Sequence, residues 1–399
     1  MPWKEHTAVD ERKAFVIAWQ RQEQSFSALC RGFGISRPTG YKWLERFDDL
    51  GEIGLADESR APLHQPRSMA GALRSAILDL RTKHPTWGPK KLKARLETDH
   101  PDLAWPARST IGELLRREGL AQPRPARRRT LLHDEPLAHA QAPNDVWCAD
   151  FKAWFLTGNG QRCDPLTVTD AYSRYLIRCR AVPKTDGPHV RQVFEAAFRE
   201  WGLPSSIRTD NGPPFATTGL AGLSRLSVWW IRLGIHPQRI VPGRPEQNGR
   251  HERFHETLQE ETAKPPQANL SRQQQRFAEF QDEYNHLRPH EALGMRTPDR
   301  FFRASSHKFP AQLPEPAYPF ECWLRRISPA THLSWKRHQI YISTLLEDQD
   351  VALRPLDDGL FEVFFGPLLL GWLDEPSATF TPQHNQPRAQ RRAGRGAQP

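Results

Sequence analysis

The sequence predicts a multidomain protein: all-α helix-turn-helix domains come first, an α/β domain follows, and a small all-β barrel lies near the C-terminus. Three observations predict this order. The chain has 399 residues, more than one hydrophobic core usually holds. Near residue 143 the apolar pattern changes from helical spacing to short alternating runs, and near residue 332 a second set of short strands begins.

Residues 1–59 predict a helix-turn-helix domain. Apolar residues recur at helical spacing over 10–22, and residues 25–47 have the pattern of a helix, a tight turn and a second helix. Ser36 is placed to cap that second helix. The side chains expected on its outer face are Arg37, Tyr41, Lys42 and Arg46. This face fits a helix that enters the major groove of DNA, and the alternative is a plain three-helix bundle with a solvated basic face.

Residues 68–121 predict a second domain of helix-turn-helix type. Its three helical patterns are GALRSAILDLRTKHP, WGPKKLKARLE and ARSTIGELLRREGL, and Ser109 is expected to cap the last of them. Lys90 and Lys91 crowd the middle helix and are expected to contact DNA. A basic linker, 122–142, follows. Its Arg127, Arg128 and Arg129 lack acidic neighbours, so they form either a solvated linker or a contact to the phosphate backbone.

Residues 143–303 predict the α/β domain. NDVWCADFKAWFLT, DPLTVTDAYSRY and LIRCRAVP have the pattern of three strands joined by turns. Helices and short strands then alternate: HVRQVFEAAFREWG, SIRTD, LSRLSVWWIRLGI, RIVPGRP, EQNGRHERFHETLQEE and SRQQQRFAEFQDEYNHL. This order is typical of a mixed sheet with helices on its faces.

Residues 331–376 predict the small β domain. HLSWKRHQIYIS, QDVALRPL, LFEVFFG and PLLLGWLD have the pattern of short strands, and Asp358-Gly359 that of a hairpin turn. We expect an antiparallel barrel of SH3 type. The basic segment 377–399 contains no acidic residue and predicts a disordered tail.

The composition favours a soluble protein with a polyanionic partner. The net charge is +10. No stretch has the apolar length of a membrane span, and the N-terminal MPWKEHTAVDERK lacks the apolar region of a signal peptide, so we expect a cytoplasmic protein without a membrane partner. The five cysteines include no C-x-x-C, so neither a disulfide framework nor a zinc site is expected.

Carboxylates of the α/β domain predict a metal site. Asp150 lies in the middle of the first strand, where an ionised carboxylate is costly unless it binds a cation or faces a cleft. Asp210, in IRTDNGPPF, ends a later strand, and the alternative role for it is to cap the Asn-Gly turn. The charged helix that follows offers Glu246, Glu252 and Glu256. Two strand aspartates and a helix glutamate can converge on one or two Mg²⁺ ions, which clamp the attacking and leaving oxygens of a phosphoryl displacement.

Three motifs in this order, VWCADF, TDNGPPF and PGRPEQNGRHERFH, resemble the catalytic core that retroviral integrases share with insertion-sequence transposases. The segment YNHLRPHEALGMRTP resembles the end of the same core in bacterial members. The resemblance implies an RNase H-like fold for residues 143–303. It implies that Asp150, Asp210 and Glu252 are catalytic and hold two Mg²⁺ ions, for which Mn²⁺ can substitute, and that Asn248 lies beside this site near DNA.

The resemblance also shows two departures from the family within the catalytic core. Relatives often carry a basic residue a helical turn or two past the glutamate, where this chain has Glu256 and Gln259. The spacing from Asp210 to Glu252 is longer than usual, and we expect TTGLAGLSRL (217–226) to be an inserted exposed loop that enters a helix. Retroviral integrases begin with a His/Cys zinc domain, whereas this chain has helix-turn-helix patterns there. This difference favours a transposase of a bacterial insertion sequence, encoded by one reading frame and located with the nucleoid.

The function expected from the sequence is therefore transposition. The protein would bind the terminal inverted repeats of its element as double-stranded DNA, act as a homo-oligomer, and catalyse metal-dependent cleavage and transfer of strands into target DNA. Two alternatives stay open: an RNase H-like nuclease without strand transfer, and a DNA-binding regulator derived from a transposase.

Overall fold

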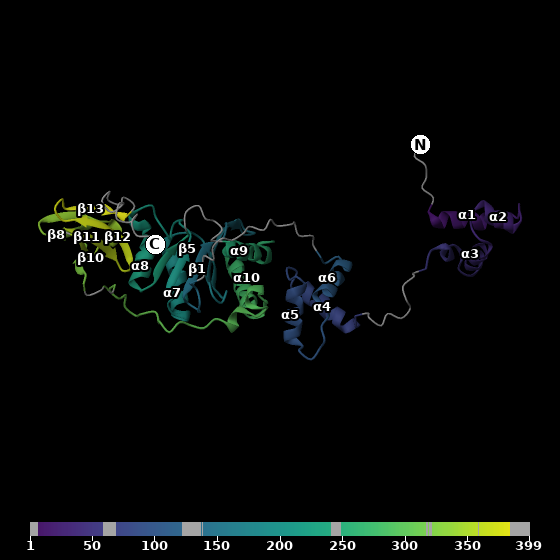
Figure 1. Ribbon diagram of the computed structural model, residues 1–399, viewed down its shortest axis with the longest axis horizontal. Coiled ribbons are helices and arrows are strands. Elements are labelled where there is room, and N and C mark those ends of the chain that lie inside the picture. Colours follow the sequence, from purple (N-terminus) through teal and green to yellow (C-terminus); the bar gives the residue numbers. More distant parts are fainter. Residues whose placement is uncertain are drawn as a thin grey trace, which may run out of the picture. The chain divides into compact units, whose positions relative to one another are not determined.

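In the computed structural model the chain divides into two compact units, Met1–Met69 and Ala70–Pro399 (Figure 1). The structure describes residues 7–58, 69–121, 137, 139–240, 249–316, 318, 321–357 and 359–383. Within these ranges, no helix has both the length and the apolar character that crossing a membrane requires.

The first unit is a helix-turn-helix fold. It contains α1 (Ala8–Gln20), α2 (Phe26–Gly32) and α3 (Arg37–Leu50), followed by the short helix η1 (Gly51–Leu55). The predicted cap at Ser36 is confirmed, because its hydroxyl accepts a hydrogen bond from the backbone N–H of Thr39. Phe15, Leu29 and Trp43 bring one buried side chain from each helix into a common core.

The second unit begins with three helices, α4 (Gly71–Lys83), α5 (Pro89–Asp99) and α6 (Arg108–Arg117). Ile77, Leu92 and Ile111 are their fully buried side chains. The prediction that Ser109 caps the last helix is wrong. Ala107 takes the extended backbone of a capping residue and its carbonyl accepts the N–H of Ile111, so the helix begins before Ser109 and has no side-chain cap.

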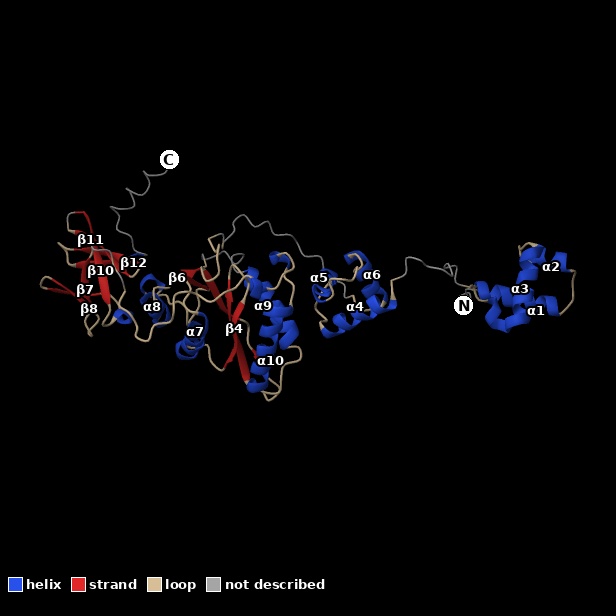
Figure 2. Cartoon of the chain, turned by 90° about the horizontal axis from the view of Figure 1, so that it is seen from below, coloured by secondary structure: helices blue, strands red, loops and turns tan. Residues whose placement is uncertain are grey.

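A six-stranded mixed sheet follows, as the strand pattern predicted (Figure 2). Its strands are β1 (Val146–Phe151), β2 (Phe155–Leu156), β3 (Arg162–Asp170), β4 (Leu176–Val182), β5 (Ser206–Thr209) and β6 (His236–Arg239). The order is β2-β3-β1-β5-β6, with β4 also paired to β3. β1 is antiparallel to β3 and parallel to β5. The last strand begins at His236, earlier than predicted, because it pairs in parallel with β5 from Ser206 onward.

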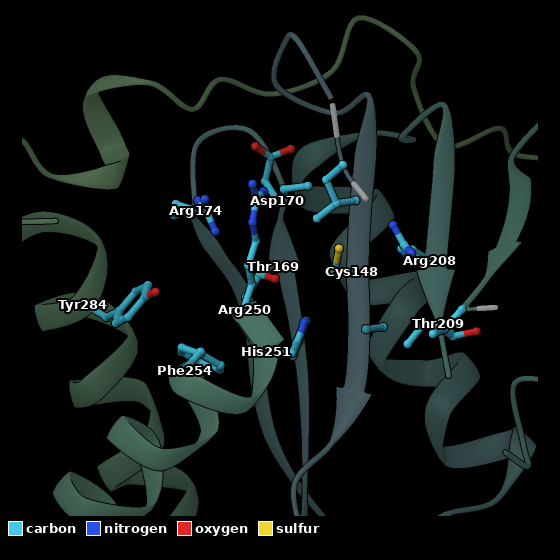
Figure 3. Close-up of a pocket in the computed structure, with 14 residues that line it drawn as sticks. Cys148, Thr169, Asp170, Arg174, Arg208, Thr209, Arg250, His251, Phe254 and Tyr284 are labelled. Atoms are coloured by element: carbon cyan, nitrogen blue, oxygen red, sulfur yellow. The ribbon is translucent and has the colours of Figure 1, made fainter. Parts of the chain in front are cut away.

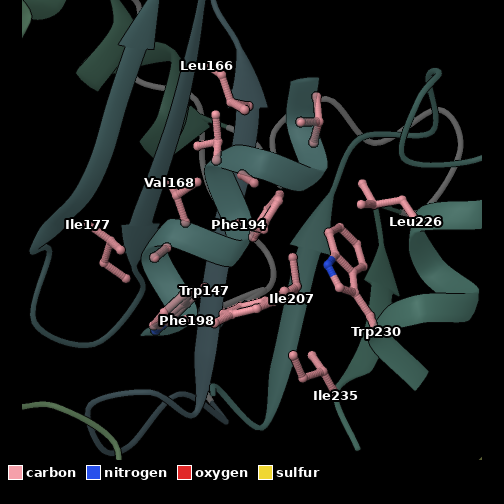
Figure 4. Packing of buried hydrophobic residues seen from close by; sticks show 14 of the residues in the cluster. Trp147, Leu166, Val168, Ile177, Phe194, Phe198, Ile207, Leu226, Trp230 and Ile235 are labelled. Carbon is pink, nitrogen blue, oxygen red and sulfur yellow. The ribbon is translucent and has the colours of Figure 1, made fainter. Parts of the chain in front are cut away.

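Helices cover both faces of this sheet. On one face, α7 (Gly187–Trp201) and α8 (Arg225–Arg232) pack Phe194, Phe198 and Trp230 against Trp147 and Ile207 of the strands (Figure 4). On the other face lie α9 (Gly249–Thr262) and α10 (Leu270–Asp282), which ends in a π-helical turn. Because side chains of a strand alternate between faces, each residue of β1 points either to the α7 layer or to the α9 layer.

The C-terminal part of the second unit is an antiparallel β domain, as predicted. Its strands are β7 (Trp323–Arg326), β8 (His332–Trp335), β9 (His338–Tyr341), β10 (Asp350–Asp357), β11 (Leu360–Phe365), β12 (Leu368–Asp374) and β13 (Thr379–Pro382). Five of them form a sheet in the order β13-β12-β11-β10-β7, and β8 pairs with β9. Closure of these strands into a barrel of SH3 type stays a prediction.

The predicted limits of this domain, 331–376, are too narrow. β7 pairs with β10 and β13 pairs with β12, so β13 lies in the segment expected to be a disordered tail. Both are edge strands. All side chains of β7 are exposed and none of β13 is fully buried, so neither strand has the alternating apolar pattern on which the prediction relied. Of the predicted Asp358-Gly359 turn, Asp358 lies outside the described residues, and Gly359 has the positive φ of a hairpin turn, 74°.

The segment 217–226 packs against the β domain. Residues 217–219 are exposed, as predicted. Leu223, however, is 1% exposed and shares a hydrophobic cluster with Ile231 of α8 and Leu370 of β12. The prediction of an exposed loop is therefore wrong for its second half, because a domain more than 100 residues away in the chain supplies the apolar surface that buries it.

Gly366 lies where the β domain meets α8, and its substitution tests this contact. Its φ is +54°, and a Cβ built there would lie 2.4 Å from Cγ2 of Ile231. Gly366→Ala is expected to lower the free energy of unfolding of the second unit by about 2–3 kcal/mol, through backbone strain and overpacking together. Gly234→Ala is the control, because Gly234 has a φ of +78° with no atom within 4 Å of its Cβ position. It should cost only about 1 kcal/mol in urea denaturation. If Gly366→Ala and Gly234→Ala lost the same free energy of unfolding, the close contact between Gly366 and Ile231 would be contradicted.

Candidate active site and DNA-binding surfaces

Asp150 lies on the face of β1 that α9 covers. Trp147 and Ala149 belong to the core beneath α7, so the alternation of the strand directs Cys148 and Asp150 to the opposite face. The side chain of Asp150 is 15% exposed. Thr167, its partner in the register of β3, donates its hydroxyl to the backbone carbonyl of Asp150 at 3.1 Å.

Asp210 follows the last residue of β5. Its Oδ1 accepts a hydrogen bond from the N–H of Gly212 at 3.2 Å, so Asp210 does cap the Asn-Gly turn. Capping does not explain its electrostatics, however. Its pKa is raised, first because the carboxyl is half-buried and second because the negative charge of Asp150 lies close by. The parallel pairing of β1 with β5 therefore brings these two predicted carboxylates together.

Glu252 lies in the first turn of α9, and its side chain is exposed. In the described part of the chain, no group of three or more His, Cys, Asp and Glu side chains could hold a metal ion. The structure thus does not gather Glu252 with the two aspartates. Of the other residues predicted here, Glu256 lies on α9, and Glu246 and Asn248 lie outside the described residues.

The chemistry of Asp150 and Asp210 fits a hard divalent cation. Both offer carboxylate oxygens, the ligands that Mg²⁺ prefers. Because the charge of one raises the pKa of the other, a cation between them would favour the ionised form of both.

Two buried histidines lie beside Asp150, and the sequence interpretation assigned them no role. Nε2 of His255 lies 2.8 Å from the Thr167 hydroxyl, and its Nδ1 lies 4.0 Å from Oδ2 of Asp150. Burial lowers the pKa of His255 to about 2 and that of His251 to about 4. Both imidazoles are therefore neutral at pH 7, so the approach of His255 to Asp150 is not an ion pair. The signal in the sequence was HERFH, whose histidines are four residues apart and so share one face of a helix.

The outer face of α3 is basic, but it exposes fewer of the predicted side chains than expected. Arg37, Tyr41 and Lys42 are exposed. Arg46 differs: its guanidinium lies over the Trp43 ring, donates to the carbonyl of Ala56 at 2.9 Å and approaches Glu58 at 3.2 Å. The outward position predicted for Arg46 is wrong, because the segment after α3 folds back over its side chain, which is 17% exposed.

The basic residues predicted in the second helical domain have contacts of their own. Nζ of Lys90 lies 2.9 Å from Glu291 of the α/β domain, and Lys91 is partly buried. Arg127, Arg128 and Arg129 lie outside the described residues. DNA contacts by these five side chains stay a prediction.

Comparison with known families agrees with the order of the domains. Residues 140–245 and 233–298 each match an integrase core domain. Residues 11–62 match a helix-turn-helix domain, and residues 39–115 match a homeodomain-like domain. The chain carries an integrase core domain behind helix-turn-helix domains.

Several proteins similar to this chain come from bacterial insertion elements. Over 261 residues it is 29% identical to the insertion element IS407 uncharacterized 31.7 kDa protein of Burkholderia multivorans, a match over 64% of this chain and 90% of that protein. It is 29% identical over 171 residues to the transposase InsD for insertion element IS2D of Escherichia coli, and the match spans 54% of that relative and 40% of this chain. Among solved structures, the HTLV-2 integrase catalytic core domain in complex with magnesium is 17% identical, with a TM-score of 0.33, over 41% of this chain and 99% of that one.

Proposed function

We propose that the protein is the transposase of a bacterial insertion sequence, which binds the terminal inverted repeats and catalyses metal-dependent cleavage and strand transfer of DNA. The observation that carries the proposal is the proximity of Asp150 and Asp210 at the carboxyl ends of the paired strands β1 and β5, within an integrase core that follows helix-turn-helix domains. Double-stranded DNA is then the partner, and two element ends are held by a homo-oligomer.

Asp150, Asp210 and Glu252 would hold two Mg²⁺ ions, or Mn²⁺ in their place. When bound, the ions supply positive charge to the attacking and leaving oxygens of an in-line displacement. The Gly212 N–H orients the carboxylate of Asp210, and Thr167 and His255 support the strand around Asp150. Glu252 is exposed at the start of α9, where DNA would be able to reach it.

The finer fold assignments belong to the same proposal. The strand order of the sheet, with β1 antiparallel to β3 and parallel to β5, supports an RNase H-like core. The five antiparallel strands and the β8–β9 hairpin support an SH3-like C-terminal domain.

The outer face of α3 is the proposed reader of the terminal repeats. The double variant Arg37→Ala/Lys42→Ala is expected to weaken binding of the full chain to a repeat duplex by about 1–3 kcal/mol per base-reading side chain, because both are exposed on the helix that would enter the major groove. Fluorescence anisotropy with repeat and scrambled duplexes measures this. Arg21→Ala, at the exposed C-terminal end of α1, is the control and should leave the preference unchanged. Equal affinity of the wild type for both duplexes would refute specific reading.

A paired-end strand-transfer assay tests the proposed function as a whole. Labelled duplexes that carry the terminal repeats are incubated with the full chain, Mg²⁺ and a supercoiled target. Joined products are the expected result. Nicking at the repeat ends without joining would favour the nuclease, and specific binding without nicking would favour the DNA-binding regulator.

A further inference from the structure

A small pocket lies between the sheet and the first turn of α9 (Figure 3). Its volume is about 50 Å³, room for about three water molecules. Cys148 contributes the wall on β1, and Thr209 the wall on β5. Cys148 is two residues before Asp150 on the same face of the strand, so the pocket lies on the order of 7 Å from that carboxylate.

Three arginines line this pocket: Arg174 from the turn after β3, Arg208 from β5 and Arg250 from α9. Burial lowers the pKa of Arg174 and of Arg208, and the positive charge of Arg250 lowers both further. The guanidinium group of Arg250 is therefore close enough to repel those of Arg174 and Arg208. An arginine nevertheless keeps its proton in a protein, so their charges concentrate at this point.

Among the described residues, no carboxylate forms an ion pair with Arg174 or Arg250. The carboxylate in the pocket, Asp170, is engaged elsewhere: its Oδ2 accepts the N–H of Asn144 at 2.8 Å, and its Oδ1 accepts the N–H and hydroxyl of Ser173 at 2.7 and 2.6 Å. Burial also raises its pKa.

Among the described residues that line the pocket, Asp170 is the one carboxylate, against three arginines. The pocket therefore has a net positive charge and polar walls.

We propose that this arginine pocket is a phosphate-binding site, which takes either a phosphodiester of the DNA substrate near the scissile bond or free phosphate. Guanidinium groups bind phosphate oxygens through paired, charge-assisted hydrogen bonds, and the first-turn N–H groups of α9 favour an anion at the same place. A bound phosphate would also remove the repulsion among the arginines. The DNA form of the proposal rests on the proposed function, whereas the site itself does not.

The test compares the full-length wild type with Arg174→Gln, Arg250→Gln and the control Arg272→Gln. Arg272 is an exposed arginine of α10 and does not line the pocket. Thermal denaturation at constant ionic strength, with chloride replaced by inorganic phosphate, reports free phosphate. The wild type and the control should gain melting temperature, and the two pocket variants should not. In chloride alone, the pocket variants should melt no lower than the wild type, because each removes a like charge; a purely structural arginine would show a loss there.

DNA binding distinguishes the two sources of phosphate. A set of repeat duplexes, each with one neutral methylphosphonate linkage near the cleavage site, is titrated against the same proteins. At one position the neutral linkage should weaken binding of the wild type and of the control but not of Arg250→Gln. Arg250→Gln should also reduce the slope of log K against log salt by about 1. Phosphate stabilisation without a sensitive linkage supports free phosphate as the ligand. If phosphate does not stabilise the protein and no linkage is sensitive, the phosphate site is refuted, even if the strand-transfer assay succeeds. A sensitive linkage without cleavage would support the site while refuting the proposed function.

Discussion

Asp150→Asn and Glu252→Gln are each expected to lower strand cleavage and strand transfer by on the order of 10³-fold or more, with repeat binding retained. Each change keeps the shape of the side chain and removes the negative charge that a divalent cation requires. Loss of the Asp150 charge should also lower the raised pKa of Asp210, so the defect comes from the missing carboxylate of Asp150 and not from protonation of Asp210. A radiolabelled cleavage assay in Mg²⁺, beside anisotropy with the same duplex, separates the chemical defect from binding.

Glu260→Gln is the matched control for this experiment. Glu260 is an exposed carboxylate on the same helix, α9, so its substitution removes the same charge from a position outside the proposed site. Cleavage by this variant should stay close to that of the wild type. The competing residue is Glu246, which precedes α9. Normal cleavage by Glu252→Gln, together with its loss in Glu246→Gln, would show that the third carboxylate has been assigned wrongly.

Arg288→Met is expected to lower the free energy of unfolding of the second unit by about 3–5 kcal/mol. Nη1 of Arg288 lies 2.5 Å from Oε1 of Glu261, and the two side chains are only 6% and 9% exposed. Thr86 of the second helical domain donates to the same carboxylate oxygen. Removal of the guanidinium leaves a buried, unneutralised carboxylate, which costs much more than the pair contributes while intact. Urea denaturation followed by tryptophan fluorescence measures the change.

Two further variants separate this cost from a simple loss of packing. Arg288→Met/Glu261→Leu should recover part of the stability, because the stranded carboxylate is then absent as well. Arg116→Met breaks an exposed ion pair with Glu113, whose pKa is about 2 because Arg116 and Arg117 bind it, yet solvent screens that pair and the variant should unfold like the wild type. Equal losses in Arg288→Met and Arg116→Met would contradict the role given to burial.

The contacts around Thr86 also describe how the second helical domain meets the integrase core. Nδ1 of His84 lies 2.8 Å from Glu283. Burial opposes ionisation of Glu283, but the hydrogen bond to His84 and the nearby positive charges outweigh it, and the pKa of Glu283 is lowered. With Lys90 and Glu291, these pairs make a polar contact between parts of the chain about 200 residues apart. Nothing in the local sequence of either part indicates it.

Prediction from sequence succeeded where a feature depends on neighbouring residues. Ser36 caps α3, Asp210 ends β5 at the Asn-Gly turn, and the alternation of β1 turns Asp150 away from the aromatic core, all as the local pattern indicated. It failed where the local signal was weak, as for the edge strands β7 and β13. It also failed where two residues could each precede the start of a helix, as Ala107 and Ser109 do for α6.

The sequence by itself determined the order of the domains, the limits of most helices and strands, and the two strand aspartates, because hydrogen bonding, capping and side-chain alternation act over a few residues. Only the tertiary structure decided which charges are available and which surfaces are buried. The chain after α3 covers Arg46, and the β domain buries Leu223. The packing of α9 against β3 buries His255 beside Asp150. The arginine pocket has the same origin, since its three guanidinium groups come from separate elements. Burial and charge at these positions depend on contacts between residues far apart in the chain, and such contacts leave no periodic pattern in the sequence.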